Sequence, residues 1–163
     1  MKSDAKIFLR LGVISGSVVA ADQITKSLVT KFLAVYETVP VITGLFNITH
    51  VLNPGGAFGL FAQHSAEVRQ FFFLFVSTLV AGLILWFYKQ TARTHLVLSS
   101  ALACIFGGAV GNLIDRFRLG KVVDFLDFYI AAWHWPAFNI ADSAICVGMA
   151  IFIYYVVVKQ VEL

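Results

Sequence analysis

Two aspartates in this sequence lie in strongly apolar surroundings. Asp124 is enclosed by Val122, Val123 and Phe125, and Asp142 lies near the start of the last long apolar segment. Two carboxyl groups held close together cannot both ionise easily, so one retains a proton while the other stays anionic. The anion can take a proton from water that attacks a peptide carbonyl, and the acid can then protonate the leaving amine. The pair therefore predicts aspartyl proteolysis, a chemistry that needs no metal and no cofactor.

Other polar residues are spaced so that they share helix faces. Asp22 and Lys26 are four residues apart, and Asn112 and Arg116 have the same spacing, with Asp115 beside them. Residues three or four apart lie on the same side of a helix. An ionisable group at membrane depth costs about 2.5–3.5 kcal/mol, so such groups normally serve a purpose. We therefore expect a single polar site at one end of the molecule, to which the two aspartates also belong.

Structural interpretations remain open for these residues. Asp22 and Lys26 can form an ion pair that satisfies a helix end, Arg116 can extend toward the membrane surface, and Asn139 can cap the last helix. The two aspartates can be ion-pair partners of Arg116. The glycines can serve close helix packing alone; they are Gly107, Gly108 and Gly111.

A metal site is a further alternative for the carboxylates. Asp115, Asp124 and Asp142 could act as ligands, although the histidine that usually joins such a set is lacking. The sequence contains neither a GxSxG nor an HExxH motif, which disfavours a serine hydrolase and a zinc protease. Aspartyl chemistry remains the favoured interpretation.

The composition indicates a membrane protein. Of the 163 residues, 60% are hydrophobic and only 13% are charged, whereas a soluble domain is nearer half apolar and a quarter charged. This excludes a disordered chain and disfavours an ordinary water-soluble globule. The net charge of +3 is too small to argue for a nucleic-acid partner.

Charged residues divide the chain into apolar segments, each close to the ~20 residues that cross a bilayer as a helix. We expect an integral membrane, mainly α protein with one domain over residues 1–163 and four transmembrane helices at about 8–29, 69–88, 96–114 and 139–158. A cleavable secretion signal is the alternative for the first segment. The outer loops, about 36–62 and 117–137, contain strand-like runs at 46–51 and 121–127, which predict a small sheet on the outer surface.

The orientation follows from the basic residues only weakly. Lysines and arginines are equally numerous in the loops on the two sides of the predicted bundle. The first helix usually dominates, and the segment before it carries Lys2, Lys6 and Arg10. We therefore expect both termini in the cytoplasm.

Four ordered blocks resemble lipoprotein signal peptidase, also called signal peptidase II. They are DQITK at 22–26, NPGGAFG at 53–59, GGAVGNLIDR at 107–116 continuing to GKVVDF at 120–125, and WPAFNIADS at 135–143. The resemblance implies transmembrane helices with a small extracytoplasmic antiparallel β-cradle, in the bacterial cytoplasmic (inner) membrane. It also implies an active site near the outer leaflet.

The resemblance further implies an activity, partners and residue roles. The activity is removal of the signal peptide from diacylglyceryl-modified prolipoproteins just before the lipidated cysteine; other partners are membrane lipids and cyclic peptide inhibitors. Asp124 and Asp142 would be catalytic, and Asp115 would orient Arg116. Substrate-binding residues would be Asn53, Gly55, Asn112, Arg116 and Asn139. Supporting residues would be Asp22, Lys26, Gly108, Asp115, Val122, Phe138 and Ala141.

Two other classes of function remain as alternatives. A small proton-coupled carrier would use buried carboxylates as ion sites near the bilayer midplane. A non-enzymatic assembly factor would need the polar residues only for structure. For the peptidase, the loop 36–61 is a candidate lid with Gly55, Gly56 and Gly59 as hinges. Phe58, Phe125 and Phe138 are candidate apolar walls of the groove.

Overall fold

The predicted helices are present in the structure, a computed structural model that describes residues 2–55 and 65–161. They are α1 (Lys2–Phe32), α2 (Ala66–Thr91), α3 (Leu96–Leu119) and α4 (Ile140–Ile153), which continues as the π-helical turn η2 (Tyr154–Val158). Each is long and apolar enough to cross a bilayer, with α4 and η2 forming one span. The predicted fold class, a mainly helical membrane protein with a small antiparallel sheet, is confirmed.

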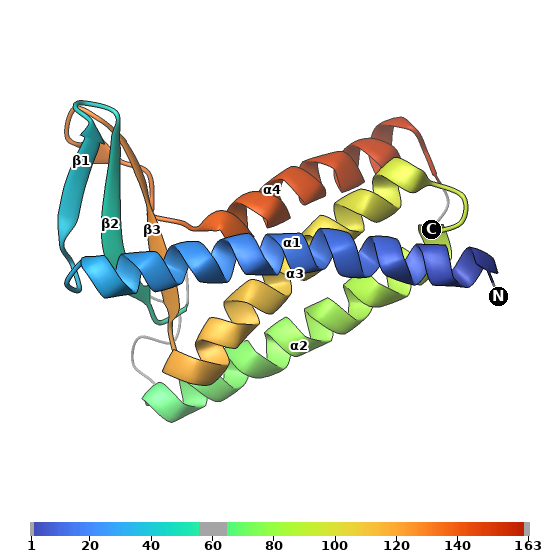
Figure 1. Ribbon diagram of the computed structural model, residues 1–163, viewed down its shortest axis with the longest axis horizontal. Helices are drawn as coiled ribbons and strands as arrows, with labels where there is room; N and C mark the ends of the chain where they lie inside the picture. The colour runs from blue at the N-terminus through green and yellow to red at the C-terminus, as the bar shows by residue number, and fades with distance from the viewer. Residues whose placement is uncertain (1, 56–64, 162–163) are drawn as a thin grey trace.

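Helix α3 is the centre of the bundle. It contacts α1, α2 and α4, which run along the same general direction around it (Figure 1). Leu98 and Leu102 of α3 pack with Ile84 and Tyr88 of α2 in the buried core. In the most apolar 18-residue stretch of α3 more than half of the residues are buried inside the protein, whereas the corresponding stretches of the other spans are 11–17% buried. In a membrane protein, lipid covers the exposed apolar side chains of such spans.

Close helix contacts in the centre depend on glycine, as one of the sequence interpretations predicts. A Cβ atom at Gly107 would lie 2.9 Å from Cα of Ser15 on α1, and one at Gly108 would lie 2.4 Å from the carbonyl oxygen of Ala141 on α4. Any larger side chain would force the backbones apart. The glycines thus set the distance at which α3 holds its neighbours.

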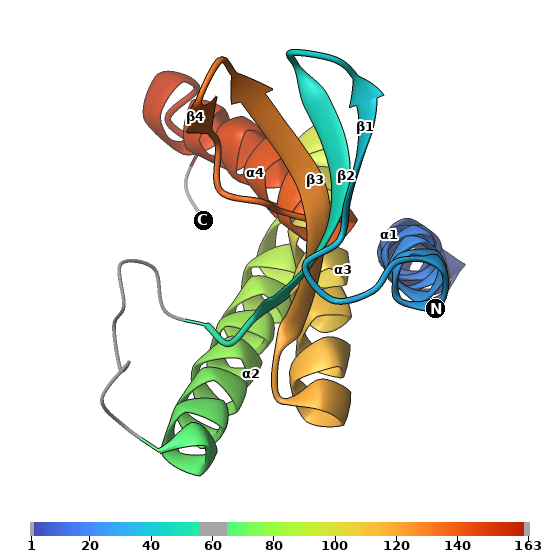
Figure 2. The same cartoon turned by 90° about the vertical axis from the view of Figure 1, so that its left-hand side faces the viewer.

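An antiparallel sheet covers one end of the bundle. Its strands are β1 (Thr38–Ile42), β2 (Phe46–Asn53), β3 (Val122–Ile130) and β4 (Trp133–His134), paired in the order β1-β2-β3-β4. The sheet stands at the end where α1 finishes and α4 begins (Figures 1 and 2). The predicted strand-like runs correspond to β2 and β3, whereas β1 and β4 were not predicted individually.

A local signal explains where β3 begins. Gly120 ends α3 in the left-handed conformation, with a φ of +68°, and this reversal sends the chain directly into β3. In the pairing of β2 with β3, Val51 lies opposite Asp124 and Asn53 lies opposite Val122. Because only Gly120 and Lys121 separate α3 from β3, the end of the bundle and the sheet form a continuous support for the polar residues.

Candidate active site

Asp142 is positioned by the start of α4. The Asn139 side chain accepts a hydrogen bond from the Asp142 backbone N–H at 2.9 Å, and the Asp142 Oδ2 accepts one from the Asn139 N–H at 3.2 Å. This reciprocal pair is a capping box, so the prediction that Asn139 caps the helix is confirmed. The N-terminal end of a helix also favours a negative charge. The cap therefore fixes the position of the Asp142 side chain at the start of α4.

Asp124 reaches the same place from β3. Its Oδ1 accepts a hydrogen bond from Asn139 Nδ2 at 2.7 Å, and its Oδ2 accepts one from Asn53 Nδ2 at 2.9 Å. Asn139 is completely buried and contacts both aspartates. The structure thus brings the two predicted carboxylates to one asparagine, although they come from different elements.

The two carboxylates differ in their surroundings. Asp124 is 2% exposed, whereas Asp142 is partly exposed. Burial and, to a smaller extent, the negative charge of Asp142 raise the pKa of Asp124 from 3.8 to about 6, against the lowering effect of the Asn53 and Asn139 hydrogen bonds and of Lys26. A buried acid with a raised pKa beside an accessible carboxylate forms the asymmetric pair that acid–base catalysis requires.

Asn112 of α3 connects this pair to the rest of the bundle. Its Nδ2 donates to Asp142 Oδ1 at 2.7 Å. Its Oδ1 accepts hydrogen bonds from Lys26 Nζ at 3.0 Å and from Asn139 Nδ2 at 3.2 Å. Every polar atom of the Asn112 side chain is therefore engaged within the protein.

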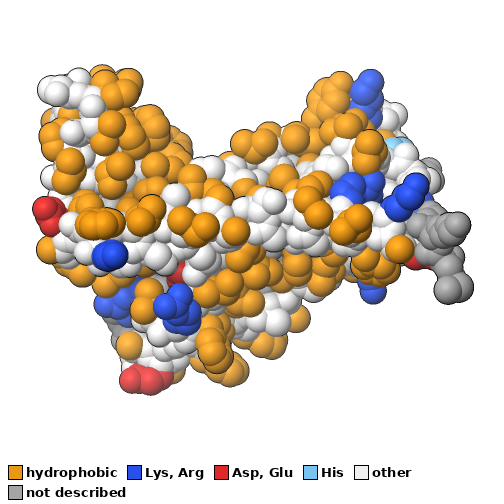
Figure 3. All heavy atoms as spheres, viewed as in Figure 1, with side chains coloured by type: hydrophobic (Ala, Val, Ile, Leu, Met, Phe, Trp, Pro, Cys, Tyr) orange, Lys and Arg blue, Asp and Glu red, His pale blue; other side chains and the backbone are white. Residues whose placement is uncertain are grey.

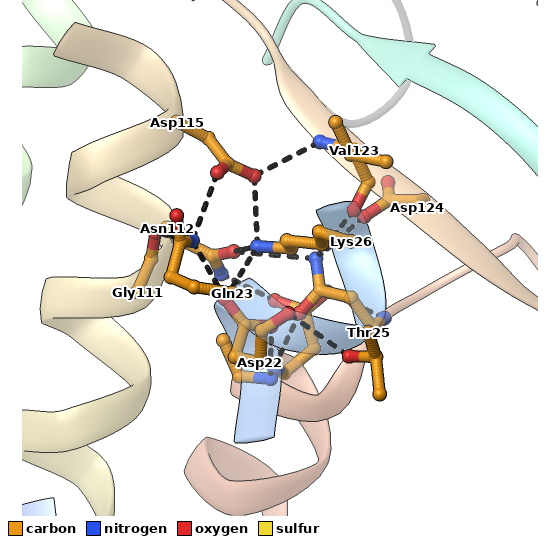
Figure 4. A network of polar contacts seen from close by, with 12 residues as sticks. Asp22, Gln23, Thr25, Lys26, Gly111, Asn112, Asp115, Val123 and Asp124 are labelled. Atoms are coloured by element: carbon orange, nitrogen blue, oxygen red, sulfur yellow. Dashed lines mark hydrogen bonds and ion pairs between the residues drawn. The ribbon is translucent and has the colours of Figure 1, made fainter. Parts of the chain in front are cut away.

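A buried charged cluster lies behind Asn112 (Figure 4). Lys26 Nζ is 2.8 Å from a carboxylate oxygen of Asp22 and 2.8 Å from one of Asp115, and all of these side chains are buried. The predicted ion pair between Asp22 and Lys26 is confirmed, and Asp115 joins it from α3. Asp22 Oδ1 also accepts from the Ala141 N–H at 2.9 Å, and Asp115 Oδ2 accepts from the Val123 N–H at 3.1 Å. The cluster thereby ties α1 and α3 to α4 and β3.

Gln23 is a member of this cluster that sequence reasoning missed. Its Nε2 donates to Asp115 Oδ1 at 3.0 Å, to Asp22 Oδ2 at 3.2 Å and to the Gly111 carbonyl at 3.2 Å. The signals for it in the sequence were its position next to Asp22 and its place in the DQITK block at 22–26. A neutral side chain one residue from a charged one carries no spacing pattern, because the contact depends on how α1 packs against α3.

The Asp115 carboxylate, which the resemblance implies orients Arg116, makes its direct contacts with other residues. The carboxylate of Asp115 accepts hydrogen bonds from Gln23 and Val123 and pairs with Lys26. The Arg116 guanidinium donates to the Asn112 carbonyl at 3.5 Å and lies over the Phe73 ring, 5.8 Å from its centroid. Arg116 therefore contacts a residue of α2 and a residue of its own helix.

The other predicted supporting residues lie around the same cluster. Gly108 faces the Ala141 backbone, and both Ala141 and Val122 are buried. The Phe138 carbonyl accepts hydrogen bonds from the N–H groups of Phe125 and Leu126. These contacts hold the segment before α4 against β3.

Asn53 and Gly55 form the turn at the end of β2. The Gly55 N–H donates to Asn53 Oδ1 at 2.9 Å, and Gly55 has a φ of +85°, a conformation that glycine adopts readily. This bond leaves Asn53 Nδ2 for Asp124. The candidate wall residue Phe58 and the candidate hinges Gly56 and Gly59 lie outside the described residues.

Asp127 points away from the pair, as its odd spacing from Asp124 predicts for a strand. Its carboxylate accepts from Asn47 Nδ2 at 2.8 Å and lies 2.8 Å from His134 Nδ1. In the described part of the chain, no group of three His, Cys, Asp or Glu residues could hold a metal ion. The alternative of a metal site at Asp115, Asp124 and Asp142 therefore gains no support.

The helices, the sheet and the pair of aspartates define the class of a membrane-embedded enzyme. Two solved structures described as bacterial membrane enzymes have similar folds. One has a TM-score of 0.79 and 33% sequence identity, covering 92% of this chain and 88% of that chain. The other has a TM-score of 0.80 and 31% identity, covering 90% of this chain and 92% of that chain.

Sequence comparison specifies the family. The family model described as Signal peptidase (SPase) II matches residues 14–158. A lipoprotein signal peptidase of Desulforapulum autotrophicum is 62% identical over 158 residues, which are 97% of this chain and 98% of the relative. One from Geobacter sulfurreducens is 48% identical over 151 residues, 93% of this chain and 91% of the relative. The chain belongs to the signal peptidase II family, a family of membrane proteases.

Proposed function

We propose that this protein is an intramembrane aspartyl endopeptidase that removes the signal peptide from diacylglyceryl-modified prolipoproteins. It cleaves just before the lipidated cysteine, in the bacterial cytoplasmic membrane. The observation that carries the proposal is the buried Asn139, which contacts the carboxylates of both Asp124 and Asp142. Family membership supports the substrate class.

The two aspartates have different roles in this reaction. Asp142 is partly exposed and lies at a helix N-terminus, which suits the anion that takes a proton from water. Asp124 is buried and has a raised pKa, which suits the acid that donates a hydrogen bond to the carbonyl oxygen. After water attacks, Asp142 carries the proton from water and Asp124 stabilises the developing oxyanion. A proton of the pair then passes to the departing amine, and the peptide bond breaks.

The position of the site fits a lipidated substrate. The acid pair lies where β3 and α4 meet, at the sheet end of the bundle (Figure 2). A groove at the outer hydrocarbon boundary would let two acyl chains remain in lipid while the peptide bond meets water. Arg116 is partly exposed and Asn53 is exposed, so both are available for substrate. Asn112 and Asn139 are buried and donate hydrogen bonds to the acid pair, so they orient the carboxylates toward the substrate.

The proposal is tested with purified protein in detergent and a diacylglyceryl-modified precursor. Asp124→Asn and Asp142→Asn should each lower turnover at least about a hundredfold while the protein still folds. Asp127→Asn is the matched control, because Asp127 contacts Asn47 and His134 instead. Full turnover in either of the first two variants would remove that carboxylate from the mechanism.

A second comparison tests the substrate class. The same precursor without its diacylglyceryl group should be cleaved much more slowly, because its acyl chains no longer hold the scissile bond at the membrane boundary. Equal rates for both precursors would contradict the lipid-dependent part of the proposal. A proton-coupled carrier or an assembly factor would cleave neither precursor.

A further inference from the structure

The orientation of the Asn112 side-chain amide decides whether the Asp142 carboxylate faces an NH2 donor or a carbonyl oxygen. An asparagine side chain has a donor end, NH2, and an acceptor end, the carbonyl oxygen, and the two ends have nearly the same shape. With the NH2 toward Asp142, the carboxylate receives a hydrogen bond, as the 2.7 Å contact shows. With the amide reversed, two oxygen acceptors would face each other at that distance. Some neighbouring group must therefore select the first orientation.

The other asparagine of the site is oriented by its own helix. The backbone N–H of Asp142 can only donate, and it lies 2.9 Å from Asn139 Oδ1. The NH2 of Asn139 must then point to Asp124. Asn112 lies within α3, far from either helix end, so no comparable backbone donor is available in its own helix.

Lys26 supplies the missing donor. An ammonium group has three donors and no acceptor, so the Asn112 atom that lies 3.0 Å from Lys26 Nζ must be the carbonyl oxygen. Asn139 Nδ2, at 3.2 Å from the same oxygen, favours the same orientation. A charged donor forms the stronger hydrogen bond.

The ammonium is itself held in place. Asp22 and Asp115 each approach Lys26 Nζ to 2.8 Å, and the lysine is 3% exposed. Figure 4 shows Lys26 between Asp22 and Asp115, with Asn112 beside them. A buried charge with two fixed counter-charges cannot turn away from Asn112 at low cost.

We propose that Lys26 is a positioning residue of the active site: through Asn112 it presents an NH2 donor, and never a carbonyl oxygen, to Asp142. The inference rests on the proposed peptidase function. In this proposal the buried charged cluster of Asp22, Lys26 and Asp115 has a role in catalysis beyond holding the helices together. Lys26 does not touch the reacting atoms and acts only through the amide.

A double-mutant cycle tests this role. Removing Lys26 alone would leave two buried carboxylates without their cation, so the cycle uses an Asp115→Asn parent. Lys26→Met in that parent leaves the cluster with one negative charge, the same net charge as in the natural protein. Turnover of the diacylglyceryl-modified precursor is measured for the parent, for Lys26→Met, for Asn112→Ala and for both together. If Asp115→Asn does not accumulate in the membrane, Asp22→Asn serves as the parent.

The expected result is strong coupling between the two positions. Lys26→Met should lower kcat roughly 10- to 100-fold in the parent, as for loss of a hydrogen bond to a charged group. In the Asn112→Ala background the same change should lower kcat less than about threefold, because no amide remains to be oriented. Equal losses in both backgrounds would show that Lys26 is structural, and no loss in the parent would remove its role.

Two further measurements complete the test. Lys26→Arg in the same Asp115→Asn parent keeps a charged donor, so it should retain most of the turnover that Lys26→Met loses there. The Asn112 side-chain amide NMR signals, assigned with Asn112→Ala, should shift when Lys26 is replaced in the Asp115→Asn parent; unchanged signals would overturn the inference. The NMR measurement does not depend on activity. It therefore separates failure of the inference from failure of the proposed function. If the proposed function fails, the natural protein itself cleaves no precursor.

Discussion

At the scale of residues, the site depends on a carboxyl group kept away from water. Asp124 lies among apolar side chains on β3 and receives hydrogen bonds from Asn53 and Asn139. Burial disfavours its charged form more than these bonds favour it, so its pKa rises to about 6. In an unfolded chain the same group would ionise near pH 3.8. Folding therefore favours the protonated form.

This difference makes stability depend on pH. Between pH 4 and 6 the folded protein binds the proton more tightly than the unfolded chain, so the Asp124 contribution is lost as pH rises through 6. Relative to the natural protein, Asp124→Asn should gain stability as pH rises from 4 to 7, by up to about 3 kcal/mol. Thermal unfolding in detergent across this range measures the change. A stability difference that stays constant with pH would contradict the raised pKa.

Asn139 combines two roles that one substitution can separate. Aspartate caps a helix as well as asparagine does, so Asn139→Asp keeps an acceptor for the Asp142 N–H. It replaces the NH2 donor toward Asp124 with an oxygen. We expect folding to persist while kcat falls roughly tenfold or more, as for loss of a hydrogen bond to a charged group.

The comparison for this prediction is Asn139→Ala, which removes both the cap and the amide. It should also lower the unfolding temperature, since a lost N-cap costs about 1 kcal/mol. If Asn139→Asp retains both the unfolding temperature and the turnover of the natural protein, capping is the only role of this residue.

At the scale of elements, the site depends on how closely α3 approaches α1 and α4. Gly108 leaves room for the Ala141 carbonyl of α4, and a Cβ at Gly111 would lie 2.7 Å from Asp22 Oδ2 of α1. These contacts occur within one turn of α3, beside Asn112. Small residues therefore set the helix separation at the level where the polar contacts form.

Gly108→Ala should disturb this arrangement. The new Cβ would lie 2.4 Å from a backbone oxygen, so α4 must shift, at a cost of roughly 1–3 kcal/mol. Because Asp142 is on α4, turnover should fall together with the unfolding temperature. Gly82→Ala on α2 is the control, since a Cβ there has nothing within 4 Å and alanine favours the helix. Equal behaviour of the two variants would contradict the packing argument.

At the scale of the whole molecule, the candidate active site and the N-terminus lie at opposite ends of the helix bundle. On the face shown in Figure 3, lysine and arginine side chains gather at the two ends, and the band between them is apolar. The sheet is at one end, and α1 begins at the other (Figure 1). This is the pattern of a protein whose middle lies in hydrocarbon and whose ends face water.

The side on which the sheet lies can be measured directly. With the native Cys104 and Cys146 replaced by alanine, single cysteines are placed at the exposed Thr43 between β1 and β2 and at Thr94 between α2 and α3. In cells whose outer membrane is permeabilised and whose inner membrane is intact, a membrane-impermeant maleimide should label position 43. Position 94 should react only after the inner membrane is opened. The reverse pattern would place the sheet in the cytoplasm.

Much of the fold could be predicted because the membrane constrains it locally. Long apolar runs separated by charges predict helices, since a lone strand cannot satisfy its backbone in lipid. The alternation of 46–51 predicted β2, and the Asp22–Lys26 spacing predicted their ion pair. Strand β1 has no buried face and β4 has two residues, so neither carries a pattern strong enough to predict.

The sequence by itself determined the helices, the two longer strands and the spacing of the charged groups. It also identified the two aspartates in apolar surroundings. Each of these features depends on residues that are only a few positions apart in the sequence. Only the tertiary structure decided that Asn139 contacts both aspartates, that Asp115 pairs with Lys26, and that Gln23 belongs to the cluster. The physical reason is that hydrogen bonds are short and directional. Which donor meets which acceptor is set by the packing of α1, α3, α4 and β3, whose contacting residues are up to 119 positions apart in the chain.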